Sequence, residues 1–306
     1  MLQTLQKVLK KAADCVIIFS GLLQGGNFME RNYIKTGYLH SDFKLFYLTD
    51  SSKKEFDFHY HDFYKILIFL NGNVSYNVEG KYFDLQPDDV ILVSAGEIHR
   101  PIIHGNSPYE RIIIYLSRDF FEKYRDDDSD LFYCFQEVQA AGSNLIRMGE
   151  AVRPRFAALN RELARSFRDQ DFAGPLYEKI KFIEYLILLN RALLNHDTAC
   201  ICASDYNQTV LDIMDYINEH ISEDLDIDTI AEHFYLTRYY IMHLFKSETG
   251  ITIGKYITEK RLFTARKLIE NGFSVTDACY RSGFRNYSAF YRAYKNKYHS
   301  SPKELL

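Results

Sequence analysis

The 306-residue sequence lacks several features that would place it in a familiar class. Its five cysteines form an odd, scattered set, which excludes a disulfide framework and favours reduced thiols in the cytoplasm. Cys200 and Cys202 lie close together, but no second pair completes a zinc site. The apolar run at residues 15–23 is far too short to span a bilayer, so no membrane partner is expected.

The chain also lacks the net positive charge typical of nucleic-acid-binding proteins, with a formal net charge of −4 at pH 7. That sum hides an uneven distribution. Residues 205–233 contain nine acidic residues and no Lys or Arg, whereas residues 234–306 contain 13 Lys or Arg and five acidic residues, a net charge of +8. This asymmetry is expected when one face of a protein meets phosphate and another faces away.

The first 28 residues are interpreted as a translated leader. Lysines precede the apolar run at residues 15–23, as in a signal peptide, but no small-x-small cleavage site follows. The residues QGGN at 24–27 can be encoded by a purine-rich run containing AGGAGG, where a bacterial ribosome-binding site for Met29 would lie. We therefore expect Met29 to be the natural start, which the intact mass of the protein expressed from its own gene would test.

Short strands separated by turns are predicted across residues 43–116. Runs such as FKLFYL, ILIFL and IIIYL are rich in β-branched and aromatic residues. The pairs Asn71-Gly72 and Glu79-Gly80 lie where two-residue hairpin loops are expected. Many short antiparallel strands with regular turns favour a sandwich or a barrel.

Two stretches of this region, FHYHDFYKILIFLNG and LQPDDVILVSAGEIHRP, resemble the conserved motifs of the cupin fold. The resemblance implies that His59, His61 and His99 fall at metal-ligand positions. The carboxylate expected four residues after the second histidine is Lys65, whose ammonium group would repel a divalent cation. We therefore predict no metal and no other cofactor, and instead a cationic, histidine-lined pocket for a polar or acidic small molecule. The alternative is that the histidines only pack and hydrogen-bond at the mouth of a barrel.

After residue 116 the pattern becomes helical. Residues 154–167 and 175–194 follow a helical rhythm with a proline near each start. The second helix has a wide apolar face, which either packs against the barrel or forms a dimer interface. Residues 196–208 are polar and aperiodic, so they are predicted to be a linker.

A helix-turn-helix pattern occurs twice in the final quarter. TRYYIMHLFKSETG begins at Thr237, and NYSAFYRAYKNKYH begins 49 residues later at Asn286. The inward positions are apolar or aromatic in both copies, whereas the outward positions differ. The outward residues are Tyr239, Met242, His243 and Lys246 in the first copy and Ser288, Tyr291, Arg292 and Lys295 in the second. A repeat that keeps its buried scaffold and varies its exposed face is typical of two readers of different DNA sequences.

A continuous helix is predicted between the two copies, at residues 252–270. At 1.5 Å per residue such a helix is roughly 28 Å long. Successive major-groove faces lie about 34 Å apart. One chain could therefore present both reading helices to one side of a duplex.

Residues 210–306 resemble the AraC/XylS family of bacterial transcription regulators, on the stretches ISEDLDIDTIAEHFYLTRYYIMHLFKSETGITIGKYI and SVTDACYRSGFRNYSAFYRAYKNKYHSSP. The front half resembles that family's cupin-type sensor. The resemblance implies that the base-reading residues are Tyr239, Met242, His243, Ser288 and Arg292. Lys246, Arg285 and Lys295 are expected at phosphates. His299 stands where the family usually has glycine, at a helix end that favours a left-handed residue.

The predicted fold class is α+β, with an N-terminal cupin-like β-barrel followed by helices and a C-terminal all-α domain. The predicted parts are a sensor barrel at 29–118, a helical dimerisation region at 119–195, a linker at 196–208 and two helix-turn-helix motifs within 209–306.

The predicted function is a sequence-specific, DNA-binding transcription regulator controlled by a small-molecule effector, and not an enzyme. A sugar effector follows from family resemblance alone. The expected partners are double-stranded DNA, a second copy of the chain, and RNA polymerase as a further candidate, at a cytoplasmic, nucleoid-associated location. Two alternatives stay open: a metal-dependent cupin enzyme fused to a DNA-binding domain, and a ligand-independent DNA-binding dimer.

Overall fold

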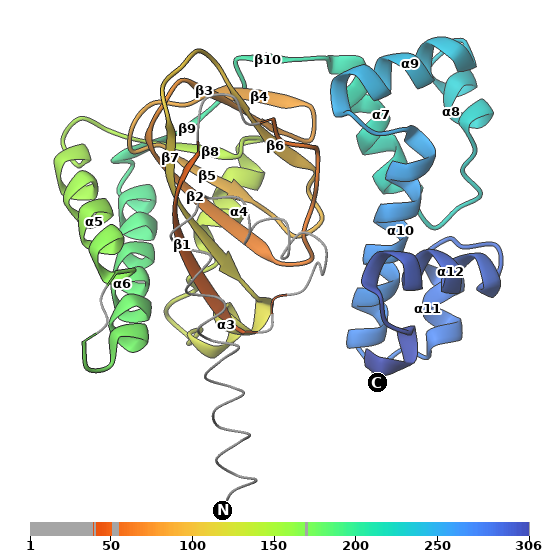
Figure 1. Ribbon diagram of the computed structural model, residues 1–306. Coiled ribbons are helices and arrows are strands. Elements are labelled where there is room, and N and C mark those ends of the chain that lie inside the picture. Colours follow the sequence, from red (N-terminus) through yellow and green to blue (C-terminus); the bar gives the residue numbers. More distant parts are fainter. Residues whose placement is uncertain (1–38, 40, 51–54, 169–170, 306) are drawn as a thin grey trace, which may run out of the picture.

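The computed structural model describes residues 39, 41–50, 55–168 and 171–305 (Figure 1). The expected leader at residues 1–28 lies outside these described residues. The sensor part contains two antiparallel sheets. The larger sheet has the strand order β1 (Phe43–Asp50), β7 (Tyr109–Leu116), β2 (Tyr64–Asn71), β5 (Val90–Val93), β8 (Leu145–Met148) and β9 (Thr198–Ile201). The smaller sheet has the order β10 (Asp205–Tyr206), β4 (Lys81–Asp84), β3 (Val74–Val78) and β6 (His99–Ile103).

The larger sheet is covered on both faces. Successive side chains of a strand point to opposite faces, so Leu67 and Phe69 of β2 pack toward β3 and β4, whereas Ile66 and Ile68 pack toward helices. These helices are α3 (Arg118–Lys123), α4 (Tyr133–Ala140), α5 (Arg153–Ser166) and α6 (Gly174–Leu194). Burial on both faces explains why β2 is a continuous apolar run instead of an alternating one.

The predicted α+β class is confirmed, and the β-rich part is a two-layered sandwich. The pairing of the described strands does not close the two sheets into one hydrogen-bonded ring. Residues 196–208, expected as a linker, contain β9 and β10, which extend the sheets beside β8 and β4.

Helix α6 has a mixed environment. Phe182, Tyr185, Leu186 and Leu189 are buried in the core against the larger sheet, whereas Ile180 on another face is exposed. Packing against the sheet thus accounts for one side of the wide apolar face, and the other side faces outward.

The C-terminal part is all-helical and lies on the opposite side of the sandwich from α5 and α6 (Figure 1). Its helices are α7 (Gln208–Glu219), α8 (Ile227–His233), α9 (Arg238–Thr249), α10 (Ile253–Glu270), α11 (Val275–Arg281) and α12 (Tyr287–Tyr298), followed by a 3-10 turn η2 (Pro302–Leu305). Among the described residues, no helix combines the length and the apolar character needed to cross a bilayer.

The two repeat copies have matching helix boundaries. Thr237 caps α9 by accepting a hydrogen bond from the Tyr240 amide, and Asn286 caps α12 by accepting one from the Ala289 amide. Helix α9 ends at Gly250 with φ 73°, and α12 ends at His299 with φ 55°, so the expected left-handed histidine is confirmed.

Helix α10 joins the two copies. Ile253 and Tyr256 at its start belong to the hydrophobic core of α7, α8 and α9, whereas Leu262 and Ile269 further along belong to the core of α11 and α12. The predicted spacer helix therefore packs into both hydrophobic cores, and it fixes α9 relative to α12 (Figure 1).

Candidate functional site

The five predicted base-reading residues lie on the two second helices of the repeat. Tyr239 is 80% exposed and Met242 is 39% exposed on α9. His243 of α9 and Ser288 and Arg292 of α12 are also exposed. Each helix therefore presents its variable face to the outside while its other face, such as Ile241 or Phe290, is fully buried.

Three cations were predicted at phosphates. Lys246 and Lys295 are exposed on α9 and α12. Arg285 is exposed in the turn before α12 and forms an ion pair with Asp224. Because both partners are exposed, that pair contributes little, and Arg285 can exchange Asp224 for phosphate at small cost.

Sequence reasoning named one of three exposed tyrosines on the first motif. Tyr235 is 97% exposed in the turn between α8 and α9, and Tyr240 is half exposed near the start of α9. Tyr235 has φ 54°, a left-handed conformation in which the sequence offers no glycine or asparagine as a signal.

The four predicted pocket residues come together inside the sensor. The ligand-capable nitrogens of His59, His61 and His99 lie within 4.8 Å of one another. The Lys65 ammonium, on a side chain only 2% exposed, is 3.4 Å from His99 Nε2. We call these four residues the histidine cluster.

Hydrogen bonds to backbone carbonyls define the tautomers of two imidazoles. His99 Nδ1 lies 3.0 Å from the Glu97 carbonyl, and His59 Nδ1 lies 2.9 Å from the Asp57 carbonyl. A carbonyl only accepts, so both Nδ1 atoms carry the proton and His99 Nε2 accepts from Lys65. His61 Nε2 is buried without a hydrogen-bond partner among the described residues.

The cluster is cationic at Lys65 and neutral at its buried imidazoles. Burial, followed by the positive charges of Lys65 and His59, lowers the pKa of His99 well below its usual value. Burial lowers the pKa of His61 in the same way, with smaller effects of His59 and Lys65. The arrangement therefore offers an ammonium donor and an unused imidazole nitrogen to a polar guest.

The donor set does not fit a divalent metal ion while Lys65 is protonated. Three imidazoles suit zinc or iron. However, the Nε2 lone pair of His99 already accepts a hydrogen bond from the Lys65 ammonium, whose positive charge would repel a divalent cation at the same nitrogen. The lysine also lies over the Tyr76 and Tyr115 rings, at 5.8 and 6.0 Å from their centroids.

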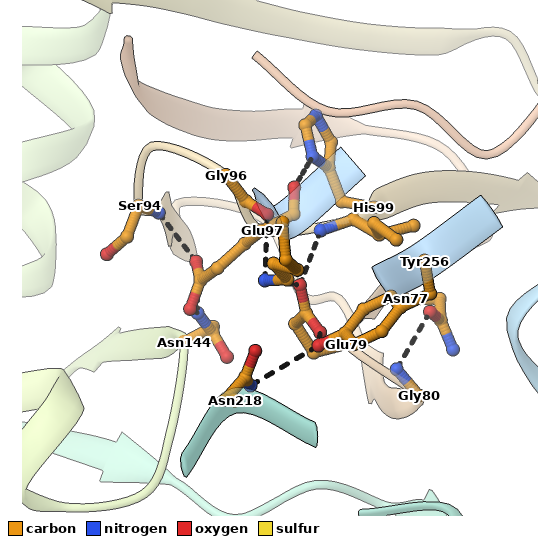
Figure 2. Close-up of polar contacts among 12 residues, drawn as sticks. Asn77, Glu79, Gly80, Ser94, Gly96, Glu97, His99, Asn144, Asn218 and Tyr256 are labelled. Atoms are coloured by element: carbon orange, nitrogen blue, oxygen red, sulfur yellow. Dashed lines mark hydrogen bonds and ion pairs between the residues drawn. The ribbon is translucent and has the colours of Figure 1, made fainter. Parts of the chain in front are cut away.

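A polar network joins the sensor to α10 (Figure 2). The Glu79 carboxylate accepts from Lys260 Nζ at 3.0 Å, from the Tyr256 hydroxyl at 2.9 Å and from the Ile98 amide at 2.8 Å. Lys260 also donates to the Gly96 carbonyl at 2.9 Å. The network thus ties the loop before His99 to the spacer helix of the DNA-reading part.

Glu97 lies in the same loop. Its carboxylate accepts from the Ser94 amide at 2.5 Å and from the Asn144 side chain at 3.2 Å (Figure 2). Burial, followed by repulsion from Glu79, raises the pKa of Glu97 to about 7. A carboxyl group with a pKa near 7 therefore lies in the loop that joins the histidine cluster to the contacts with α10.

A cavity of about 570 Å³ opens beside this network. Its lining combines Arg118 and Glu122 of α3 with Arg266 and Lys267 of α10. Arg266 also forms an ion pair with Asp62 of the sensor. The sensor and the helical part therefore meet through a partly open, mixed-charge interface.

Comparison with known proteins agrees with this division. A family described as an AraC-like ligand binding domain matches residues 46–179, and one described as a helix-turn-helix domain matches residues 230–306. The HTH-type transcriptional activator RhaS of Shigella sonnei is 24% identical over 252 residues, which cover 82% of this chain and 87% of that protein. RhaS of Escherichia coli K12 is 23% identical over the same length.

Two solved structures are also similar to parts of this chain. ToxT from Vibrio cholerae is 15% identical, with a TM-score of 0.33, and the match covers 86% of this chain and 97% of that one. The DNA-binding domain of AdpA in complex with a target DNA is 27% identical, with a TM-score of 0.30, and the match covers 31% of this chain and 86% of that one.

A ligand-binding domain followed by paired helix-turn-helix motifs defines a ligand-responsive, DNA-binding transcription regulator. The chain belongs to the AraC family of such regulators. The RhaS relatives are named transcriptional activators, in agreement with the prediction of a regulator and not an enzyme.

Replacing Lys65 by glutamate should convert the histidine cluster into a metal site. The carboxylate would remove the competing ammonium and add a fourth ligand, giving a three-His, one-Glu set. We expect purified Lys65→Glu to retain roughly one zinc ion per chain, measured by elemental analysis after exposure to zinc and gel filtration. Wild type and the neutral control Lys65→Gln should retain far less. Full zinc occupancy of the wild type would contradict the assignment and favour the metal-dependent enzyme.

The Glu97 carboxyl should make stability fall as pH rises. Its pKa is about 7 in the folded protein against 4.5 as the ordinary value, so the folded state binds the proton more tightly. That contribution is fully present below about pH 4.5 and is lost as pH rises to about 7. From pH 5 to pH 8, urea unfolding should therefore show a larger loss of stability in wild type than in Glu97→Gln. The exposed control Glu232→Gln should follow wild type; equal slopes for all three proteins would refute the prediction.

Proposed function

We propose that α9 and α12 read two half-sites of an operator, with Tyr239, Met242, His243, Ser288 and Arg292 at base edges and Lys246, Arg285 and Lys295 at phosphates. The exposure of all five base-reading residues on two helices held by one spacer supports this proposal. Since α10 is rigid and shared by both cores, the two helices act as one reader of adjacent major-groove faces.

We further propose that the effector is a small polar or acidic molecule, with a sugar or sugar acid as the candidate class, bound at the histidine cluster. The observation that carries this is the buried His61 Nε2 without a described partner beside a buried ammonium. Hydroxyl groups can donate to the imidazole nitrogen, and oxygen atoms can accept from Lys65.

The biological setting follows from the same proposal. The exposed Leu176, Tyr177 and Ile180 of α6 would form a homodimer interface, with residues 119–195 as the dimerisation region. The RhaS relatives are named transcriptional activators, and activation would make RNA polymerase a partner at the promoter. Such a protein works on the nucleoid in the cytoplasm.

Selection of duplexes from a random library by the full-length protein tests the DNA-reading proposal. The expected product is a site with two half-sites about 10 base pairs apart. If no sequence is enriched at low ionic strength, the proposed function is wrong.

Arg292→Ala should lose discrimination in one half-site of the selected duplex, by about 1–3 kcal/mol at the base pair that Arg292 contacts. Lys295→Ala, one turn away on the same helix, should weaken binding to all sequences alike and reduce the salt dependence by about one counterion. Fluorescence anisotropy with single-base variants of the duplex, over a range of salt concentrations, measures both effects. Unchanged selectivity of Arg292→Ala would show that this residue does not read a base.

A thermal-shift screen of sugars and sugar acids tests the effector class. A true effector at 100 times its Kd stabilises the folded chain by about 2.7 kcal/mol. The shift should disappear in Lys65→Gln and persist in the control His196→Gln, whose side chain is exposed near the end of α6. A panel without any stabilising compound would favour the ligand-independent dimer.

A further inference from the structure

Two short sensor segments, residues 57–61 and 97–100, form a ribbon that is covered on both faces. His59 and His99 exchange backbone hydrogen bonds of 3.2 and 2.9 Å. Because side chains alternate along extended chain, neighbours in sequence point to opposite faces. The front face carries His59, His61 and His99 of the histidine cluster. We call this pair of segments the histidine ribbon.

The back face of the histidine ribbon is part of the first helix-turn-helix core. Ile98, only 3% exposed, belongs to the same buried cluster as Ile241 of α9 and Tyr256 of α10. Phe58 and Tyr60 pack against that cluster. The Phe58 ring also lies directly against Gly250, where an added Cβ would overlap the ring.

The same segment reaches the second helix-turn-helix. The Lys297 ammonium of α12 lies 3.7 Å from the centroid of the Tyr60 ring. The next outward residue, Asp62, pairs with Arg266 of α10. Alternate residues at 58, 60 and 62 therefore contact the end of α9, the side of α12 and the spacer between them, while 59 and 61 belong to the histidine cluster.

We propose that the histidine ribbon couples the occupancy of the histidine cluster to the placement of both reading helices. This inference rests on the proposed function and adds the physical route of regulation. Close-packed cores do not deform continuously, so a guest that shifts the backbone of the histidine ribbon from the front face also shifts Ile98 and Tyr60 on the back. Coupling between two sites is reciprocal, and DNA bound to α9 and α12 must therefore alter the histidine cluster.

Reciprocity allows a test without knowledge of the effector. The probe is the duplex selected by the full-length protein, added to the full chain labelled at histidine Cε1 for NMR. Single His→Gln variants assign the signals. His243, on the reading face of α9, reports that the duplex is bound, and His196, at the end of α6, is the control expected to stay unchanged.

We expect the signals of His61 and His99 to shift on duplex binding, although both lie inside the sensor. If His243 shifts while His61 and His99 do not, the ribbon does not couple the sites and the inference is wrong. If His243 does not shift with any duplex, the proposed function itself fails, and the inference falls with it.

A pair of glycine variants tests whether the back face is the route. Gly250 has φ 73° and lies against Phe58, whereas Gly272, after α10, has φ 87° and open space around an added Cβ. Both alanine substitutions carry similar backbone strain, but only Gly250→Ala pushes on the histidine ribbon. In the DNA-free protein, Gly250→Ala should shift the His61 and His99 signals, and Gly272→Ala should leave them in place.

Removing the Phe58 ring supplies the decisive control. In a Phe58→Ala background the Cβ at position 250 has no ring to displace, so Gly250→Ala should no longer shift the His61 and His99 signals. Equal effects of Gly250→Ala and Gly272→Ala, or an effect of Gly250→Ala that survives Phe58→Ala, would mean that the contact acts only as local packing.

Discussion

In an extended segment, neighbouring side chains point to opposite faces. When both faces are packed, a single backbone position must suit the contacts on both sides. In the histidine ribbon, a shift of the backbone at His99 also moves Ile98, because the two side chains leave neighbouring Cα atoms in opposite directions. The front neighbour is a polar cluster around Lys65, and the back neighbour is the hydrophobic core that contains Ile241. The histidine cluster and the first helix-turn-helix core therefore lie on opposite faces of the histidine ribbon. The remaining contacts between the sensor and the helical part surround this ribbon.

Ion pairs reinforce the contact between the sensor and α10. Glu79 receives Lys260 and the Tyr256 hydroxyl, and Asp62 receives Arg266, so the acidic residues belong to the sensor and the basic residues to α10. A cation that pairs with the sensor is not available to phosphate. The basic final quarter of the sequence thus divides into two groups: Lys246 and Lys295 are exposed and are the proposed phosphate contacts, whereas Lys260 and Arg266 hold the spacer helix against the sensor.

Much of the fold could be predicted because its signals are local. Periodicity located α10 within one residue at its start, and the repeat located the caps Thr237 and Asn286. The left-handed turn at His299 is expected from the resemblance to a family that usually has glycine there. The histidine cluster could be assembled only through resemblance to cupin motifs, since His59 and His99 are forty residues apart.

The interface could not be predicted, because a sequence pattern shows that a face is apolar but not what covers it. Ile98 is one apolar residue in a loop, and its partners lie on α7, α9 and α10, more than a hundred residues away. Residues 198–201 and 205–206 are only four and two residues long, too short to show a strand periodicity. They form strands because the edges of two existing sheets supply partners for their backbone groups.

The position of the interface limits how regulation can work. The proposed base-reading residues of α9 and α12 are exposed while the back face of the histidine ribbon is packed against the helical part. The contact between the sensor and the helical part therefore leaves the proposed reading surface exposed. An effector consequently cannot act by uncovering that surface. The contact instead fixes the position of α9 and α12 relative to the sensor, because Gly250 lies against Phe58 and Lys297 lies over the Tyr60 ring. Because α10 holds α9 and α12 together, the proposed coupling requires only that a displacement of the histidine ribbon move the pair as one unit relative to the sensor.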